Sequence, residues 1–248
     1  MPTYPARVLV LRKTKLGETD TILTLLAADG RQLRAVAKGL RKPGGRFGGR
    51  LEPYSVADLM LHEGRSLDVV TEAEAVATHA GLREDYDRNA AAAVVVDVLD
   101  KISVEGQVEE RLFGLSTTTL DVMETAPLEA LPALVTAFLI KSMAIHGYRP
   151  ELSGCATCGG ELGGTARFSV ATGGALCGDC DSAEAGGVAF SAEGRAWLIA
   201  LLGARMAEVP ELGMPPVAAA DCFALMRAFV AYHLPARLRA LDFYAGQL

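Results

Sequence analysis

The sequence is poor in aromatic residues and lacks a long apolar run free of charge. Phe, Tyr and Trp make up 6% of the 248 residues, so we expect cores built mainly from Leu, Val and Ala. No apolar run reaches the roughly 18–20 residues that a membrane helix needs, since Lys141 interrupts the most apolar stretch, residues 131–147. The first 15 residues carry four basic side chains in place of the apolar core of a secretory signal. We therefore expect a cytoplasmic protein without membrane association.

Several motifs of catalysis and nucleotide binding are also absent. Neither the Walker pattern G-x-x-x-x-G-K-[ST], nor G-x-G-x-x-G, nor G-x-S-x-G occurs. The four histidines are scattered, and His62-Glu63 lacks the second histidine of H-E-x-x-H because Ser66 stands there. No side chain presents itself as catalytic, so we expect a protein that is not an enzyme.

Positive charge is scarce overall but concentrated near the N-terminus. The net charge of the chain is −6, yet residues 1–50 hold eleven Lys and Arg against three acidic residues, a net charge of +8. The remaining residues carry a net charge of −14. This asymmetry indicates that one end of the chain meets a polyanion, and a solvated basic face without a partner is the alternative.

Residues 1–80 have the pattern of a small β-barrel. Val- and Leu-rich segments predict five strands, and Asp29-Gly30 predicts a tight turn between the second and the third. Five short strands around a tight hairpin favour an OB-fold, with an SH3-like barrel as the alternative. The expected strands are residues 6–13, 20–26, 32–38, 54–61 and 66–76.

The cations of this region form a candidate DNA-binding surface. Residues 41–50 contain four Gly, one Pro and four cations, which predicts a mobile basic loop after the third strand. Few aromatic side chains lie nearby (Tyr4, Phe47 and Tyr54), so we expect phosphate contacts that are blind to base sequence. The candidate DNA-binding residues are Lys13, Lys15, Arg34, Lys38, Arg41, Lys42, Arg46 and Arg50.

The rest of the chain is predicted to be helical, with one insertion of different composition. Apolar stretches that begin near residues 89, 108, 128, 191 and 218 predict a buried helical bundle. Residues 150–190 are instead rich in Gly and contain two cysteine pairs. We therefore expect an α+β multidomain chain. Its parts are an OB-fold barrel at 1–80, a helical domain at 81–149 and 191–248, and a zinc module at 150–190.

The two cysteine pairs give the strongest single signal. Cys155-x2-Cys158 and Cys177-x2-Cys180 have the spacing of a four-cysteine zinc site. Four thiolates complete a tetrahedron and leave no open position for water, so we expect one structural Zn²⁺ ion. An iron–sulfur cluster and paired redox thiols are the alternatives. Acidic residues outnumber cations five to one in this segment, so we do not expect it to bind DNA.

Three short motifs near the start of the chain suggest a family. A Gly-Glu-x-Asp step ends at Asp20, an Ala-Lys-Gly-x-Arg-Lys segment spans residues 37–42, and Leu51-x-Pro53 precedes the fourth strand. With the order of barrel, bundle and cysteine module, the sequence resembles the RecO family of bacterial recombination mediators. The resemblance implies an OB-fold that binds single- and double-stranded DNA and anneals complementary strands. It also implies RecR and the C-terminal tail of the single-strand DNA-binding protein as partners, in the cytoplasm and at the nucleoid during repair.

An acidic and aromatic tail needs an apolar groove with a cation on its rim. Lys141 and Arg149, near the apolar residues 138–145, are the candidates for that role. A rival interpretation is an adaptor whose basic barrel docks an acidic protein rather than DNA. A third is a nuclease that uses acidic residues such as Asp85 and Asp87.

Overall fold

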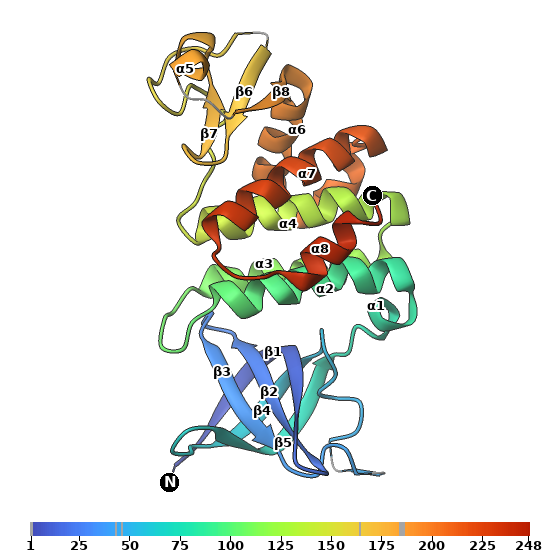
Figure 1. The fold of residues 1–248 in the computed structure, drawn as a ribbon. Coiled ribbons are helices and arrows are strands. Elements are labelled where there is room, and N and C mark those ends of the chain that lie inside the picture. Colours follow the sequence, from blue (N-terminus) through green and yellow to red (C-terminus); the bar gives the residue numbers. More distant parts are fainter. Residues whose placement is uncertain (1, 43, 46, 164, 184–186) are drawn as a thin grey trace. The chain divides into compact units, whose positions relative to one another are not determined.

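The first five strands close into a barrel in the computed structural model, which describes residues 2–42, 44–45, 47–163, 165–183 and 187–248 (Figure 1). The order around the barrel is β1-β2-β3-β5-β4, and β3 with β5 is the parallel pair. This order is typical of an OB-fold, so the predicted OB-type barrel is confirmed. The strands are β1 (Thr3–Leu16), β2 (Asp20–Ala27), β3 (Gln32–Ala37), β4 (Val56–His62) and β5 (Asp68–Ala77).

The barrel core is made of small and branched aliphatic side chains, as the scarcity of aromatic residues predicted. Alternate residues of the strands point inward, such as Leu23 and Leu25 of β2 and Ala35 and Ala37 of β3. One aromatic ring also enters the core, from Phe47 in the segment between β3 and β4. That segment is therefore anchored to the barrel by an apolar side chain.

Three helices complete the first of two compact units, Met1–Glu124. They are α1 (Ala80–Glu84), α2 (Tyr86–Ile102) and α3 (Glu110–Thr125). Helix α2 begins three residues before the predicted start near residue 89, because the side chain of Asp85 caps it by accepting a hydrogen bond from the N–H of Arg88. The buried ring of His79 links the barrel to α3. Its Nδ1 contacts the carbonyl oxygen of Tyr54, and its Nε2 contacts Oδ1 of Asp121, each at 2.8 Å.

The second unit, Thr125–Leu248, is built around helix α4 (Leu131–Ile145). This helix packs against α6 (Ala192–Gly203) and α7 (Pro216–His233). Ser191 caps α6 as predicted, accepting a hydrogen bond from the N–H of Gly194. Pro235 lies in the break between α7 and α8 (Arg239–Ala245). The unit also contains two short 3-10 helices, η1 (Leu128–Ala130) and η2 (Met206–Leu212).

One segment corrects the expectation about apolar length. By length and composition alone, Leu128–Ile145 passes the test for a membrane-spanning helix, with a mean hydropathy of 1.7. We expected Lys141 to interrupt the apolar stretch before it reached the length of a membrane helix, and that expectation was wrong. However, 67% of the segment is buried inside the protein, and most side chains of α4 are buried. Helices that are apolar on all sides also form the centre of helical bundles.

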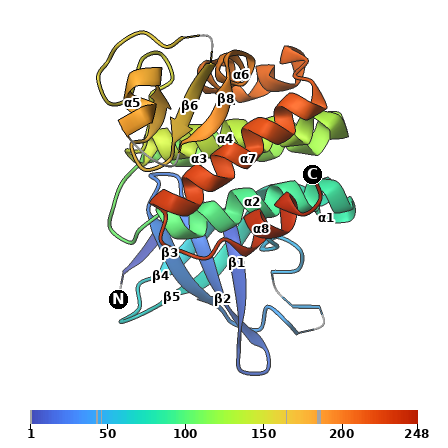
Figure 2. The same ribbon diagram turned by 45° about the horizontal axis from the view of Figure 1, so that its top comes forward.

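The cysteine segment is inserted between the helices α4 and α6, as predicted, and it contains a small three-stranded sheet that was not predicted (Figure 2). Its order is β7-β6-β8, with both pairs antiparallel. The ring of Phe168 packs edge-on against Phe229 of α7, with ring centroids 5.9 Å apart. The elements are β6 (Thr165–Ser169), β7 (Gly174–Leu176), α5 (Gly178–Ala183) and β8 (Val188–Ser191). The predicted domain boundaries at residues 80, 149 and 190 stay predictions.

Candidate nucleic-acid interface and metal centre

The start of the basic loop is tied to the turn between β1 and β2. Oδ1 of Asp20 accepts a hydrogen bond from the N–H of Gly39 at 2.8 Å. The N–H of Arg41 donates to the carbonyl oxygen of Thr19 at 3.0 Å, and the Arg41 guanidinium donates to that of Glu18. Gly39 has a φ of 68°, in the left-handed region that favours glycine. The Gly-Glu-x-Asp and Ala-Lys-Gly-x-Arg-Lys motifs therefore meet at one end of the barrel.

The carboxylate of Asp20 lies among cations. The hydrogen bond from Gly39 lowers its pKa most, followed by the hydroxyl of Thr19, and the charges of Lys38 and Lys42 lower it further. Asp20 is therefore charged at neutral pH and holds the loop in place while leaving the surrounding field positive.

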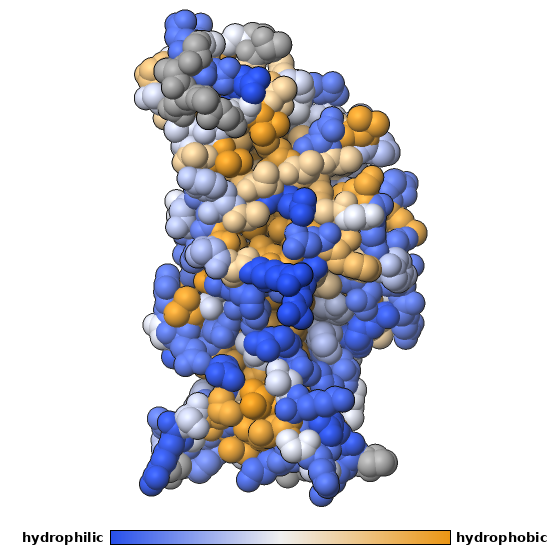
Figure 3. Space-filling model, viewed as in Figure 1, coloured by the Kyte–Doolittle hydropathy of each residue, from blue (hydrophilic) through white to orange (hydrophobic). Residues whose placement is uncertain are grey.

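The outer face of β3 and the residue directly after it carry two of the candidate residues. Arg34 and Lys38 are exposed, while the alternate side chains of the strand point into the core. Between them lies Val36, which is half-buried and pairs with Ile22 of β2. On the face drawn in Figure 3, hydrophilic side chains border an apolar area over the barrel strands. The outer face of β3 thus has one half-buried apolar side chain, Val36, between two exposed cations.

The two candidates on β1 lie on a different face. Lys13 pairs in register with the core residue Leu23, and Lys15 pairs with Thr21. The Nζ of Lys13 forms an ion pair with Glu52 at 2.7 Å, whereas Lys15 is exposed. Both belong to the end of the barrel where the basic loop lies, rather than to the outer face of β3.

The structure therefore divides the predicted surface into two groups. Arg34 on β3 and Lys38 directly after it form the first group. Each group has one member whose charge acts on the carboxylate of Asp20: Lys38 in this group, and Lys42 in the group at the loop end. Arg46 lies outside the described residues. The group at the loop end consists of Lys13, Lys15, Arg41, Lys42 and Arg50.

The aromatic side chains near this surface are turned away from solvent. Phe47 is 3% exposed and Tyr54 is 5% exposed, so neither presents a ring to a base. Tyr4 is half-buried, and its hydroxyl donates a hydrogen bond to Asp68. The arrangement favours phosphate contacts, as the sequence predicted.

Arg65 is a cation that our sequence analysis missed. It stands in the turn between β4 and β5 and lines, with Arg34, a cavity of about 180 Å³. It carried no signal in the sequence, because it is isolated from the other cations and only the parallel pairing of β3 with β5 brings it near Arg34.

The four cysteines come together as predicted. Their Sγ atoms all lie within 4.8 Å of one another, and those of Cys158 and Cys177 are 3.8 Å apart. Sulfur atoms bound to one zinc ion at about 2.3 Å in a tetrahedron are about 3.8 Å apart, so the cluster fits such an ion. Cys155 is buried, Cys158 is exposed, and Cys177 and Cys180 are half-buried.

The backbone around the cluster favours thiolates. Hydrogen bonds from the backbone at Cys158 and Cys177 lower the pKa of Cys155 to about 6. Hydrogen bonds with the sulfur atoms of Cys177, Cys158 and Cys155 raise the pKa of Cys180, and repulsion by the charge of Cys155 adds a smaller contribution. A cation at the centre would remove that repulsion. The fifth cysteine, Cys222, is buried in α7, as expected of a small apolar residue.

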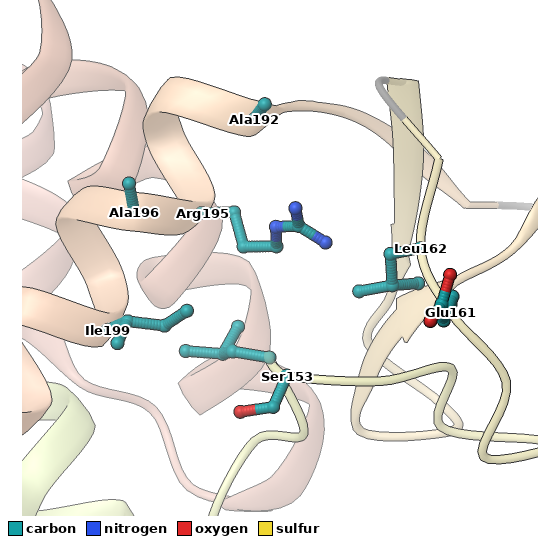
Figure 4. Close-up of a pocket in the computed structure, with 8 residues that line it drawn as sticks. Ser153, Glu161, Leu162, Ala192, Arg195, Ala196 and Ile199 are labelled. Carbon is teal, nitrogen blue, oxygen red and sulfur yellow. The ribbon is translucent and has the colours of Figure 1, made fainter.

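A cavity of about 440 Å³ lies between α6 and the segment that carries the first cysteine pair (Figure 4). Arg195 points into it from α6, and Leu162 faces α6 from the opposite side. The sequence gave no signal for this cavity, because its two walls are far apart in the chain.

The two candidates for a protein partner have different surroundings. The Nζ of Lys141 donates hydrogen bonds to the carbonyl oxygens of Leu202 and Ala204 at the end of α6, both at 2.7 Å. Burial lowers the pKa of Lys141. Arg149 is exposed. Lys141 thus has a structural role within its unit, and the use of either cation by a partner stays a prediction.

Comparisons with known proteins agree with these features. Residues 1–79 match the family model described as Recombination protein O N terminal, and residues 83–242 match Recombination protein O C terminal. The chain is 42% identical over 183 residues to the DNA repair protein RecO of Rubrobacter xylanophilus, covering 73% of each chain. It is 36% identical over 249 residues to the DNA repair protein RecO of Nocardioides sp., covering 97% of this chain and 98% of that one. The corresponding protein of Desulforamulus reducens is 30% identical over 244 residues, covering 98% of this chain and 94% of that one.

Proposed function

The chain belongs to the RecO family of DNA repair proteins, and from that premise we propose that it is a recombination mediator. In this role it binds single- and double-stranded DNA, anneals complementary strands and helps to load the recombinase. The observation that carries the proposal is the cationic surface of the barrel, where two groups of basic side chains meet around Asp20.

The chemistry needed for annealing is modest. Two strands approach each other only when the repulsion between their phosphates is reduced, and Lys and Arg side chains do this without a nucleotide cofactor. The bases must stay unpaired and accessible, which phosphate contacts allow. No described residue group near the barrel has the arrangement of a nucleophile and its base, so we propose a protein that is not an enzyme.

We also propose that the four cysteines hold one structural zinc ion. The Sγ spacing and the lowered pKa of Cys155 support this assignment. Four sulfur ligands leave no position for a reacting water, so the ion would stabilise the small sheet. The acidic charge of the segment argues that DNA binds elsewhere.

The proposal includes two protein partners, RecR and the C-terminal tail of the single-strand DNA-binding protein. Arg149 is the exposed candidate for the acidic tail, with Lys141 as the second. The site of action would be the cytoplasm, with association to the nucleoid during repair. The domains would be the barrel (1–80), the helical domain (81–149 and 191–248) and the zinc module (150–190).

The test is annealing of two complementary oligonucleotides by the full chain, without nucleotide and without magnesium. We expect duplex formation faster than the spontaneous reaction, and slower annealing by a variant with Lys38→Glu and Arg41→Glu. Binding of acidic proteins without annealing would instead identify an adaptor. Magnesium-dependent cleavage of the strands would identify a nuclease.

A further inference from the structure

Aromatic rings gather where α4 and α7 end. The ring centroid of His233, the last residue of α7, lies 4.7 Å from that of Tyr148 and 5.1 Å from that of Tyr232. The ring of His146, which caps α4, lies 5.8 Å from Tyr148. We call these four residues, His146, Tyr148, Tyr232 and His233, the aromatic surface.

Two members of the aromatic surface are open to solvent. Tyr232 is 57% exposed and Tyr148 is 39% exposed. Beneath them, His233 packs on the buried ring of Phe229, with centroids 4.4 Å apart. The Nε2 of His233 is buried and has no hydrogen-bond partner among the described residues. Ring packing therefore holds His233 in place, and the two tyrosines rest on a fixed aromatic base.

The chain around the aromatic surface is mostly basic, with Glu151 as an exposed acid close enough to Arg149 for that cation to lower its pKa. Residues 130–150 and 222–241 contain no acidic residue, although the sequence beyond residue 50 is strongly acidic overall. Arg149 follows Tyr148 directly, and Arg237 and Arg239 come shortly after the end of α7. All three are exposed. Exposed aromatic rings among cations are typical of surfaces that bind single-stranded nucleic acid, since bases stack on the rings while phosphates meet the cations.

The barrel offers little of this capacity, because Phe47 and Tyr54 are buried and Tyr4 is half-buried with its hydroxyl bound to Asp68. We propose that the aromatic surface stacks unpaired bases of single-stranded DNA, through Tyr232 and Tyr148. This inference rests on the proposed DNA-binding function and adds a second contact to it. The barrel would hold phosphates of either strand type, and the aromatic surface would select strands whose bases are free.

The experiment compares two single-stranded probes of equal length, a 20-nucleotide dT oligonucleotide and an abasic sugar-phosphate oligonucleotide. Their affinities for the full chain are measured by fluorescence anisotropy. The variants are Tyr232→Leu and Tyr148→Leu, with Tyr232→Phe to restore the ring. Tyr86→Leu is the matched control, since Tyr86 is 68% exposed on α2 in the other unit.

We expect the wild-type chain to bind dT more tightly than the abasic probe. Tyr232→Leu should weaken dT binding about fivefold or more, because stacking on an aromatic ring accounts for a difference of that size per base. Its affinity for the abasic probe should stay unchanged, because that probe has no bases to stack on the ring. A general loss of folding would instead lower the affinity for both probes. Tyr232→Phe and Tyr86→Leu should bind dT like the wild type.

Three results would overturn the proposal. The first is equal wild-type affinity for dT and the abasic probe, which leaves the barrel function intact. The second is unchanged dT affinity in both leucine variants. The third is unchanged dT affinity together with weaker binding of an acidic, aromatic peptide, which would assign the surface to a protein partner. Failure of the wild type to bind either probe would reject the proposed function itself.

Discussion

Asp20 and Gly39 are 19 residues apart in the chain and are joined by a hydrogen bond of 2.8 Å from the backbone N–H to the carboxylate. The contact connects the turn after β1 to the first residues of the basic loop. The charges of Lys38 and Lys42 both act on that carboxylate, so one acid links the two groups of the cationic surface. The left-handed φ of Gly39 is the conformation that lets its N–H reach the acid.

Replacing Asp20 separates its charge from its hydrogen bond. Asp20→Asn keeps an oxygen acceptor for the N–H of Gly39, whereas Asp20→Ala removes it. We expect faster trypsin cleavage after Arg41 in Asp20→Ala than in Asp20→Asn, measured by mass spectrometry of limited digests; the bond after Lys42 resists trypsin because Pro43 follows it. Equal cleavage rates in the two variants would show that the hydrogen bond does not restrain the loop.

The same contact predicts a dependence on pH. The pKa of Asp20 is lowered in the folded state. The stabilisation that its carboxylate gives to the loop is therefore fully present above the ordinary pKa of an aspartate, and is lost as the pH falls through the lowered value. We expect the loop of the wild-type chain to become easier to cleave on acidification, assayed with an acid-active protease. Asp20→Ala should show little of this change.

Phe47 is predicted to act through stability rather than through stacking. Its ring is buried in the barrel core, and a buried Phe→Ala change costs about 3–5 kcal/mol. We expect Phe47→Ala to lower the unfolding free energy of the barrel by that amount in urea titrations. Phe47→Leu should retain most of the stability and bind DNA normally. Loss of DNA affinity in a stable Phe47→Leu variant would contradict the buried role.

Removal of one cysteine should release the metal and loosen the small sheet. We expect about one zinc ion per wild-type chain by elemental analysis, because the apparent free energy of zinc binding to such sites, about 10–16 kcal/mol, is coupled to folding. Cys155→Ser and Cys180→Ser should lose it, while Cys222→Ser should keep it. Metal-free wild-type protein with four freely reactive thiols, purified without a chelator, would rule out the structural zinc.

Variants at Arg149 and Lys141 can distinguish a role in binding a partner from a role in supporting the fold. Arg149→Glu should weaken an acidic, aromatic tail peptide without changing the melting temperature, since its side chain is exposed. Lys141→Glu should weaken the peptide and also lower the melting temperature, because it removes the donor to Leu202 and Ala204. Unchanged peptide affinity in both variants, measured by calorimetry, would remove these residues from the partner surface.

Much of this architecture follows from local patterns in the sequence. Val- and Leu-rich segments located the five strands, Ser191 stood at the start of a helix, and the cysteine spacing located the cluster of four cysteines. These signals depend on neighbours in the chain. Local patterns could not decide between an OB-fold and an SH3-like barrel, because the difference depends on the short parallel pairing of β3 with β5.

Other features depend on contacts between distant residues. Phe47 is an isolated aromatic residue in a Gly-rich segment, so no period in the sequence shows that it enters the core. The bond between Asp20 and Gly39 and the proximity of Arg65 to Arg34 also require the closed barrel. The rings of Tyr148 and His233 meet only because α4 and α7 end side by side.

The central claim, that cations of the barrel hold DNA by its phosphates, is tested most directly by the salt dependence of binding. If five cations at the end of β3 and in the basic loop (Lys38, Arg41, Lys42, Arg46 and Arg50) each contact a phosphate, the logarithm of affinity on single-stranded DNA should fall against the logarithm of salt concentration with a slope of about −3.5. Lys38→Glu with Arg41→Glu should weaken all base sequences alike and flatten this slope by about 1.4, whereas Arg205→Glu, an exposed change in the other unit, should do less. If the double variant keeps both the affinity and the slope of the wild type, the barrel is not the DNA-binding surface.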